Sequence, residues 1–336
     1  MALTAIPVGF SGVLMSFGYF LASVSQNIYL LILIQGIFVG IGASVCFGPF
    51  LADISHYFKK FRGVAIGIAA SSNYFAGALW PYFIEPFLIQ SSWREAYLGI
   101  GVICLCLMVP LSWFLRVPPK LEIAQSNDLE EKQALIPSGF RSFQIQAMLM
   151  LAGVSCCVAM SMPQIHLVAL CSDLGFGVTV GTEMLSLMLA CGIISRLVFG
   201  FLADRIGGVQ TLLLSSFLQT ISLLFYLAAD GLVSLYLVSA VFGLSQGGIV
   251  PSYTLVIREY LPSKEAGIRI GAVMMATTFG MAFGGWLTGE IFDWTGSYKA
   301  ALWNGITWNL LNLMLVGMLM IRPILIKLRD NELQLT

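Results

Sequence analysis

An arginine lies inside one of the most apolar stretches of the chain. Arg196 occurs in "ACGIISRLVFGFLADRIGG", residues 190–208, and the stretch ends in the acid–base–glycine cluster 204–208. A charge in a hydrocarbon environment costs at least about 2.5 kcal/mol, so such residues face a cavity or a polar partner. A planar guanidinium suits a two-pronged contact with a carboxylate. Arg196 is therefore a candidate anion-binding residue; the alternative is a structural arginine that bonds backbone carbonyls or Ser195.

The composition defines the environment of these residues. Of 336 residues, 58% are hydrophobic and 10% are charged, and the mean hydropathy is +0.88. Soluble domains carry about 25% charged residues, so lipid must solvate most of this chain. The formal net charge is zero and no long basic run occurs, so we expect no nucleic-acid partner.

The reactive side chains show no arrangement for enzyme chemistry. The seven cysteines have no metal-ligand spacing, and 156–157 and 104–106 are short-range pairs inside apolar runs, where cysteine behaves as a small hydrophobe. No nucleotide-binding glycine loop and no HExxH motif is present. No nucleophile, base and orienting group converge on one motif. We therefore expect no metal, no cofactor and no enzymatic activity.

Apolar runs of membrane-spanning length dominate the chain. A membrane helix needs about 20 mostly apolar residues, and this length predicts an all-α polytopic membrane protein with about ten spans. The spans are expected near 2–23, 28–52, 62–84, 95–115, 142–170, 179–203, 209–229, 233–257, 266–289 and 299–323. Residues 116–141 are polar, contain prolines and are acidic in the middle, which is typical of a linker between two bundles.

Lysine and arginine gather in alternate connections. The segments 57–62, 116–141, 204–208 and 258–269, with the tail after 321, hold 14 of the 17 basic residues. Basic residues favour the cytoplasmic side of a membrane. This bias predicts that these segments and the carboxy terminus are cytoplasmic.

The two halves of the chain share an order of features. "YLLILIQG" (29–36) resembles "YLVSAVFG" (236–243), and each is followed by a basic segment and a helix rich in small residues, "GIAASSNYFAG" (67–77) and "GAVMMATTFGMAFGG" (271–285). Repeated halves are typical of secondary transporters. About 94 residues of the second half precede Tyr236 but only 28 precede Tyr29, so equal halves would require roughly 65 further residues, or two helices.

Several motifs resemble a known family. "GFLADRIGG" (200–208) resembles the cytoplasmic loop motif of the major facilitator superfamily, and "YFKKFRGVAIGIAAS" (57–71) is similar to the start of helix five in monocarboxylate transporters. Residues 166–176, 257–271 and 284–298 resemble the bacterial branch of monocarboxylate transporters and oxalate/formate antiporters. The resemblance covers essentially the whole chain and corresponds to helices three to twelve of the usual twelve.

The resemblance implies a two-bundle fold in a 4+6 rather than a 6+6 arrangement. The expected domains are a shortened bundle at 1–115, a cytoplasmic linker at 116–141, a six-helix bundle at 142–325 and a cytoplasmic tail at 326–336. It also implies that Arg196 binds a substrate carboxylate. The chain departs from the family at Gly192, where human-type monocarboxylate transporters carry an aspartate four residues before this arginine.

Further polar residues in the spans are candidates for lining a substrate cavity. They are Asn73, Tyr74, Gln246, Tyr253 and His166. Gln246 and Tyr253 flank glycines and a proline that suit a flexing helix. His166 follows Pro163, which is expected to break its helix, and histidine titrates near neutral pH. The alternative for each residue is a hydrogen bond between neighbouring helices.

The second half of the opening motif has a separate expected role. By family resemblance, Gly200, Asp204, Arg205 and Gly207, with Arg62, form a conformational latch at the cytoplasmic face. Asp204 can reach the positive end of an adjacent helix or Arg62, Gly200 allows close approach of another helix, and Gly207 allows a tight turn. The alternative is a plain helix terminus with an arginine that only fixes topology.

These expectations define three hypotheses. The first is a secondary transporter of a small organic anion, a monocarboxylate, in the bacterial inner membrane, coupled to a proton or to an exchanged anion. The second keeps the fold but changes the cargo to a drug, a sugar or another solute. The third is a non-transporting, truncated membrane protein. The nucleotide sequence upstream of Met1 would separate the third from the others.

Overall fold

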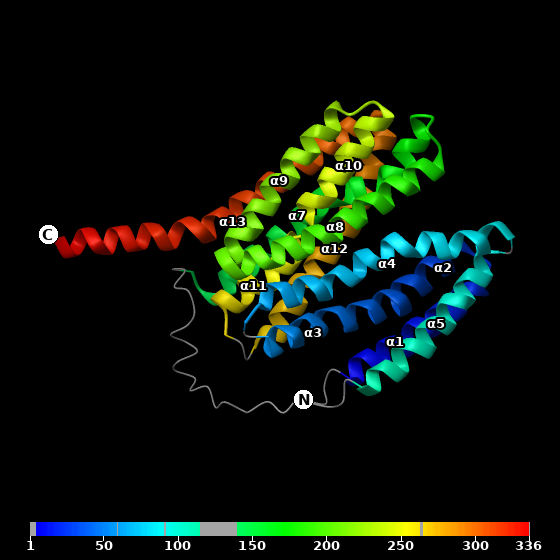
Figure 1. The fold of residues 1–336 in the computed structure, drawn as a ribbon, viewed down its shortest axis with the longest axis horizontal. Helices are drawn as coiled ribbons and strands as arrows, with labels where there is room; N and C mark the ends of the chain where they lie inside the picture. Colours follow the sequence, from blue (N-terminus) through cyan, green and yellow to red (C-terminus); the bar gives the residue numbers. More distant parts are fainter. Residues whose placement is uncertain (1–4, 59, 91, 115–139, 263–264, 336) are drawn as a thin grey trace. The chain divides into compact units, whose positions relative to one another are not determined.

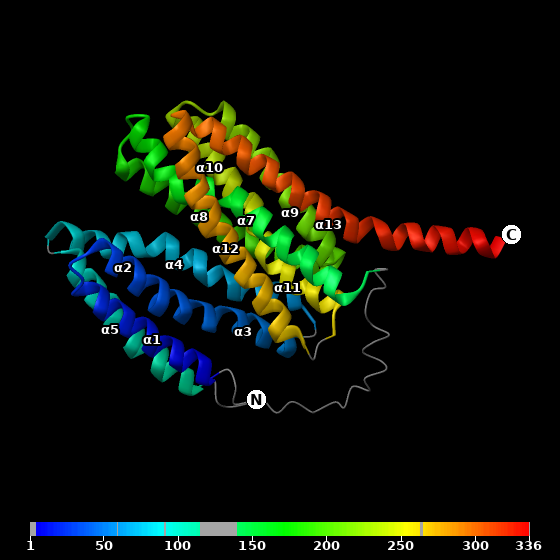
Figure 2. The same cartoon turned by 180° about the vertical axis from the view of Figure 1, so that it is seen from behind.

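The structure is a computed structural model that describes residues 5–58, 60–90, 92–114, 140–262 and 265–335. All regular secondary structure in these ranges is helical, and the helices follow one another in the predicted order (Figures 1 and 2). Eight helices among the described residues are long and apolar enough to span a membrane. The prediction of an all-α polytopic membrane protein is confirmed.

The first half contains four helical segments. The second of them is a composite helix, α2, η1 and α3, with a π-helical turn in its middle. The bounds are α1 Ala5–Ser23, α2 Ile28–Ile34, η1 Gln35–Gly40, α3 Ile41–Tyr57, α4 Arg62–Gln90 and α5 Trp93–Phe114. Asn27 caps α2, because its side chain accepts a hydrogen bond from the Tyr29 amide at 2.9 Å, as expected for asparagine at a helix start.

The second half contains six segments, one of which is interrupted between α10 and α11. The bounds are α7 Ser142–Asp173, α8 Val178–Ile206, α9 Gly208–Ala228, α10 Leu232–Gln246, α11 Ile249–Tyr260, α12 Ala266–Thr295 and α13 Tyr298–Leu335. Helix α7 packs against α12 and α13, and α10 packs against α8 and α9. In α8, Ile194 and Val198 are exposed whereas Met188 and Arg196 are buried. One face of this helix is therefore suited to lipid and the other to the bundle.

The chain divides into two compact units, and the division falls within α4. One unit contains Met1–Asp53 and Leu79–Asp128, and the other contains Ile54–Ala78 and Leu129–Thr336. The first part of α4 therefore belongs with the second half, which differs from the predicted boundary at 115. Residues 115–139, which hold most of the predicted linker, lie outside the described residues.

Glycines explain why the first part of α4 belongs with the second half. A side chain at Gly63 or Gly200 would collide with the backbone of the other residue, and a Cβ at Gly67 would lie 2.6 Å from the Arg196 carbonyl oxygen. A Cβ at Gly77 would lie 2.8 Å from Leu189 Cδ1. Helices α4 and α8 thus run antiparallel at very short separation, as small residues allow inside membranes.

Two expected helix interruptions have different outcomes. The span at 232–260 is interrupted at Gly247 and Gly248 between α10 and α11. These glycines press against Ser195 and Phe199 of α8 and have no room for a side chain. The expected break at Pro163 is wrong, because α7 continues through it. Proline removes one intrahelical hydrogen bond, but Ser161, Met162 and Pro163 itself are buried, and this packing holds the helix in line.

Polar side chains occupy the centre of the second unit. The Tyr253 hydroxyl donates to Asn312 Oδ1 at 3.0 Å, and Asn312 Nδ2 donates to Ser216 Oγ at 2.8 Å. Asn309 Nδ2 donates to the Ser216 carbonyl at 2.8 Å. Hydrogen bonds of this kind join helices where no water competes, at about 0.6 to 2 kcal/mol each. They tie α9, α11 and α13 together.

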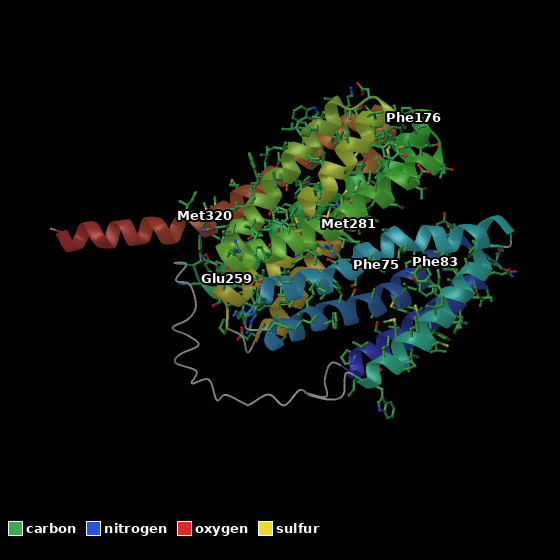
Figure 3. All side chains as sticks on the ribbon, viewed as in Figure 1. Phe75, Phe83, Phe176, Glu259, Met281 and Met320 are labelled. Atoms are coloured by element: carbon green, nitrogen blue, oxygen red, sulfur yellow. The ribbon has the colours of Figure 1, made fainter. Side chains whose placement is uncertain are left out.

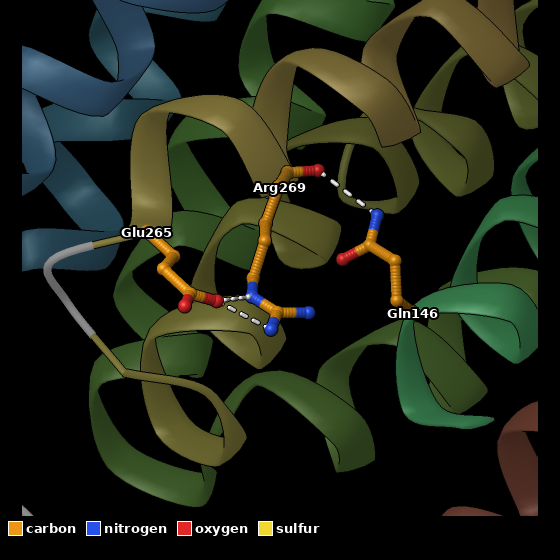
Figure 4. A network of polar contacts seen from close by, with 3 residues as sticks. All are labelled: Gln146, Glu265 and Arg269. Carbon is orange, nitrogen blue, oxygen red and sulfur yellow. Dashed lines mark hydrogen bonds and ion pairs between the residues drawn. The ribbon is translucent and has the colours of Figure 1, made fainter. Parts of the chain in front are cut away.

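The start of α12 is fixed to α7 by a smaller network (Figure 4). Gln146 Nε2 donates to the Arg269 carbonyl at 3.2 Å, and the Arg269 guanidinium pairs with Glu265 one turn earlier. Because Glu265 faces Arg269, it makes no capping bond to the start of α12.

The contact between α8 and α10 provides a test of the packing. A Cβ at Gly243 would collide with the Met188 carbonyl, whereas the position at Gly317 is open. We expect Gly243→Val to destabilise the fold by about 1–3 kcal/mol through overpacking, and Gly317→Val to have little effect. Thermal unfolding in detergent measures both. Equal Tm values for the two variants would contradict the described contact.

Candidate functional site

Arg196 is the buried cation around which the candidate site is built. Its side chain is 3% exposed, and Nη1 donates to the Ala70 carbonyl of α4. Its Cζ lies 3.5 Å from the ring centroid of Tyr74, a cation–π distance. The Nε atom is buried without a hydrogen-bond partner among the described residues.

Tyr74 lies between Arg196 and the preceding turn of α8. A Cβ at Gly192 would lie 2.5 Å from Tyr74 Cδ2, so this ring position requires glycine there. An aspartate at 192 would collide with the ring. In the part of the chain that the structure describes, no carboxylate forms an ion pair with Arg196. The Tyr74 ring thus occupies the space that the side chain of an aspartate at position 192 would need.

Two glutamine amides extend the site onto α7 and α10. Gln164 Nε2 donates to Gln246 Oε1 at 2.8 Å and lies 3.4 Å from the Tyr74 hydroxyl. Gln246 is 1% exposed, and its Nε2 atom is buried with no partner among the described residues. A buried donor without an acceptor costs about 1–3 kcal/mol.

These four residues form one connected group, which we call the Arg196 cluster: Tyr74, Gln164, Arg196 and Gln246. Each comes from a different helix, α4, α7, α8 or α10. The cluster leaves two buried donors unsatisfied within the described chain, Arg196 Nε and Gln246 Nε2. An ionised carboxylate only accepts hydrogen bonds. A bound carboxylate would therefore supply the hydrogen-bond acceptors that these two donors lack.

Three other predicted site residues lie elsewhere. Tyr253 is fully buried and bonds Asn312. His166 Nε2 lies 2.9 Å from the Gly285 carbonyl of α12; it follows Gln164 by two residues, which turns it about 200° away from the cluster. Asn73 is exposed and one residue from Tyr74, on another face of α4. Of the predicted site residues, the structure brings only Tyr74 and Gln246 to Arg196.

Sequence reasoning did not select Gln164. The feature that selected Gln246, a carboxamide side chain in an apolar span, is also present at Gln164. It adjoins Pro163 and Met162, both buried on α7.

A second arrangement lies at the end of α8. The Asp204 carboxylate accepts hydrogen bonds from the Gly63 amide at 2.6 Å and the Val64 amide at 3.1 Å. These N–H groups belong to the first turn of α4 and have no partner within their own helix. The expected contact between Asp204 and an adjacent helix start is present, and the carboxylate also meets the positive end of the helix dipole.

Glu259 makes the corresponding contact for α9. Its Oε1 accepts from the Gly208 amide at 2.7 Å, and Figure 3 labels this residue at the end of α11. Sequence reasoning did not select it. Arg62 bonds the Phe58 carbonyl at 3.3 Å and is close enough to Glu259 and Asp204 for their charges to act on it.

The remaining residues of the predicted latch have local roles in this structure. The Arg205 guanidinium lies 4.2 Å from the Phe201 ring centroid, one turn earlier on α8. Gly207 has φ of +89° and separates α8 from α9. A left-handed φ of this kind favours glycine, so Gly207 makes the turn between these two helices.

The capping role of Asp204 is testable. We expect Asp204→Ala to destabilise the fold by about 1 kcal/mol and Asp204→Asn to cost less, because the amide keeps an acceptor. Thermal unfolding in detergent is the measurement. The matched control is Asp230→Ala, because Asp230 is an exposed acid in a 3.5 Å pair with Lys299 and such pairs contribute about 0–1 kcal/mol. A Tm for Asp204→Ala at or above that of the control would refute the capping role.

Comparison with known proteins identifies the class. Residues 5–284 and 149–332 match the sequence profile of the Major Facilitator Superfamily. The chain belongs to this superfamily, and it is an integral membrane protein with the fold of a transporter.

Similar sequences include transporters of animals and fungi. Monocarboxylate transporter 13 of Rattus norvegicus is 26% identical over 293 residues, which cover 86% of this chain and 67% of the relative. The MFS-type transporter pynF of Aspergillus niger is 26% identical over 277 residues, covering 81% and 62%. The chain thus spans roughly two thirds of the length of these relatives.

Solved structures share the fold. The proton:xylose symporter XylE has a TM-score of 0.71 at 14% identity, covering 93% of this chain and 79% of XylE. The human organic anion transporter MFSD10 has a TM-score of 0.65 at 14% identity, covering 95% and 81%. At such identities the likeness concerns the fold alone.

Proposed function

We propose that this protein carries a small monocarboxylate across the membrane by alternating access, with the carboxylate held by Arg196 and Gln246. The observation that carries the proposal is the pair of buried donors without partners among the described residues, Arg196 Nε and Gln246 Nε2. A carboxylate has two oxygens and can accept from both.

The position of Arg196 supports this role. It precedes Asp204 by eight residues, which is about 12 Å along a helix. The hydrocarbon core is about 30 Å thick, so Arg196 would lie near its middle, where transporters bind their substrates. The cluster contains a single cation, which matches one carboxylate rather than two.

Alternating access also requires contacts that close one end of the transporter and can open again. The contacts at the end of α8 are suited to this role. Asp204 and Glu259 each hold the first turn of a different helix. In our proposal these contacts close the cytoplasmic end in one state and separate in the other. Proton symport and anion exchange are both compatible with the Arg196 cluster.

Uptake of radiolabelled lactate into proteoliposomes that contain this chain tests the proposal. We expect Arg196→Ala to lower kcat/KM at least about tenfold, since a lost bond to a charged group costs about 1.5–3 kcal/mol. Arg196→Lys should recover only part of it, because an ammonium lacks the planar fork.

The control is Lys299→Ala, which removes one cation that is 59% exposed and lies outside the cluster. It should leave uptake unchanged. Full lactate uptake in Arg196→Ala would rule out the carboxylate role.

A second candidate is export of a larger or neutral solute. It is favoured by similarity to fungal proteins such as the agnestins efflux protein AgnL12 of Paecilomyces divaricatus, which is 22% identical over 305 residues, covering 88% of this chain and 67% of the relative. Arg196 would then be structural, through its bond to Ala70. Transport of a neutral solute that persists in Arg196→Ala would support this candidate.

A further inference from the structure

We infer that Gln164 is a positioning residue, which orients the Gln246 amide so that the site offers only donors to its ligand. This inference rests on the proposed function, because it concerns how the same carboxylate is recognised. The proposed function assigns no role to Gln164, although this residue contacts two other members of the Arg196 cluster.

The argument begins with the two ends of a carboxamide. Gln246 can present either its oxygen, an acceptor, or its NH₂ group, a donor. Gln164 Nε2 donates to Gln246 Oε1 at 2.8 Å, which fixes the oxygen on the Gln164 side. The Nε2 end of Gln246 then remains buried, with no partner in the described part of the chain.

Gln164 also contacts the residue that covers Arg196. Its Nε2 lies 3.4 Å from the Tyr74 hydroxyl, and the Tyr74 ring lies over the guanidinium. The same amide group thus contacts side chains of both α10 and α4, and its shorter contact is the one to Gln246.

The backbone that carries Gln164 is held firmly. The preceding residues Ser161, Met162 and Pro163 are buried in α7, and the Ser161 hydroxyl bonds the Val158 carbonyl of its own helix at 2.7 Å. Site residues are positioned well when their support is packed. Gln164 is therefore suited to fix the orientation of its neighbours.

This orientation determines which ligand the site prefers. A ligand group that only accepts hydrogen bonds would satisfy both Gln246 Nε2 and Arg196 Nε. If the Gln246 amide turned over, its oxygen would face the carboxylate oxygen and repel it. Gln164 thereby favours a carboxylate over a neutral amide of the same shape.

The first experiment is a double-mutant cycle with lactate uptake as the readout. Gln164→Leu should raise KM for lactate about tenfold, with a smaller change in kcat. In a Gln246→Leu background the same substitution should have little further effect on KM, because no amide remains to be oriented.

The matched control is Gln146→Leu. Gln146 lies on the same helix and also donates a hydrogen bond to another helix, at 3.2 Å to the Arg269 carbonyl. This variant should keep the wild-type KM. The rise in KM would then be specific to the loss of Gln164 and not a general effect of losing a glutamine on α7.

The second experiment uses Gln164→Glu. When the introduced carboxyl is ionised, it accepts from Gln246 Nε2 and turns the amide over, so KM should rise. Below the pKa of this carboxyl, its O–H donates to Gln246 Oε1, and KM should recover. The recovery should disappear in the Gln246→Leu background. Recovery that persists there would show that only the charge of the carboxylate acts on Arg196, and would overturn the inference.

Other outcomes separate the inference from the proposed function. Loss of uptake in Arg196→Ala with an unchanged KM in Gln164→Leu would overturn the inference alone. No lactate uptake by the wild type would overturn both. If Gln164→Leu is too unstable for transport, the increase in Tm on adding lactate can be measured for the same set of variants instead. Equal increases in the wild type and Gln164→Leu would count against the inference.

Discussion

The packing of α4 against α8 depends on the need to satisfy one guanidinium away from water. Arg196 is 3% exposed in an apolar span, and its charge must be stabilised by dipoles, rings or a ligand. The Ala70 carbonyl and the Tyr74 ring provide part of that stabilisation. Both belong to α4, so the same helix that approaches α8 through glycines also supplies the polar contacts of the buried charge.

The close approach of α4 and α8 and the polar contacts of Arg196 are therefore linked. The glycines of α4 and α8 allow the two backbones to approach, and at this separation the Ala70 carbonyl of α4 accepts from the Arg196 guanidinium of α8. Gly192 affects both the packing and the charge balance, because it makes room for the Tyr74 ring and places no acidic side chain next to Arg196. A larger residue here would change the packing and the electrostatics of Arg196 together.

The sequence predicted the helices well because hydropathy over about 20 residues is a strong signal. The sequence also indicated that Arg196 needs polar partners, because a charge in an apolar run must be stabilised, and it offered an adjacent helix start as one of two partners for Asp204. It did not predict which of several polar residues meet. Gln164 and His166 are two residues apart, yet they face different helices. Their direction depends on whether α7 bends at Pro163, and packing, not local sequence, decides that.

The contact of Asp204 with the start of α4 links movement to hydration. The Gly63 and Val64 amides have no partner in their own helix and take a carboxylate from α8 instead. If the two helices separated at this end, both amides and the carboxylate would need new partners at once, and water is the partner available at a helix end. Separation and wetting of this end would then be a single event.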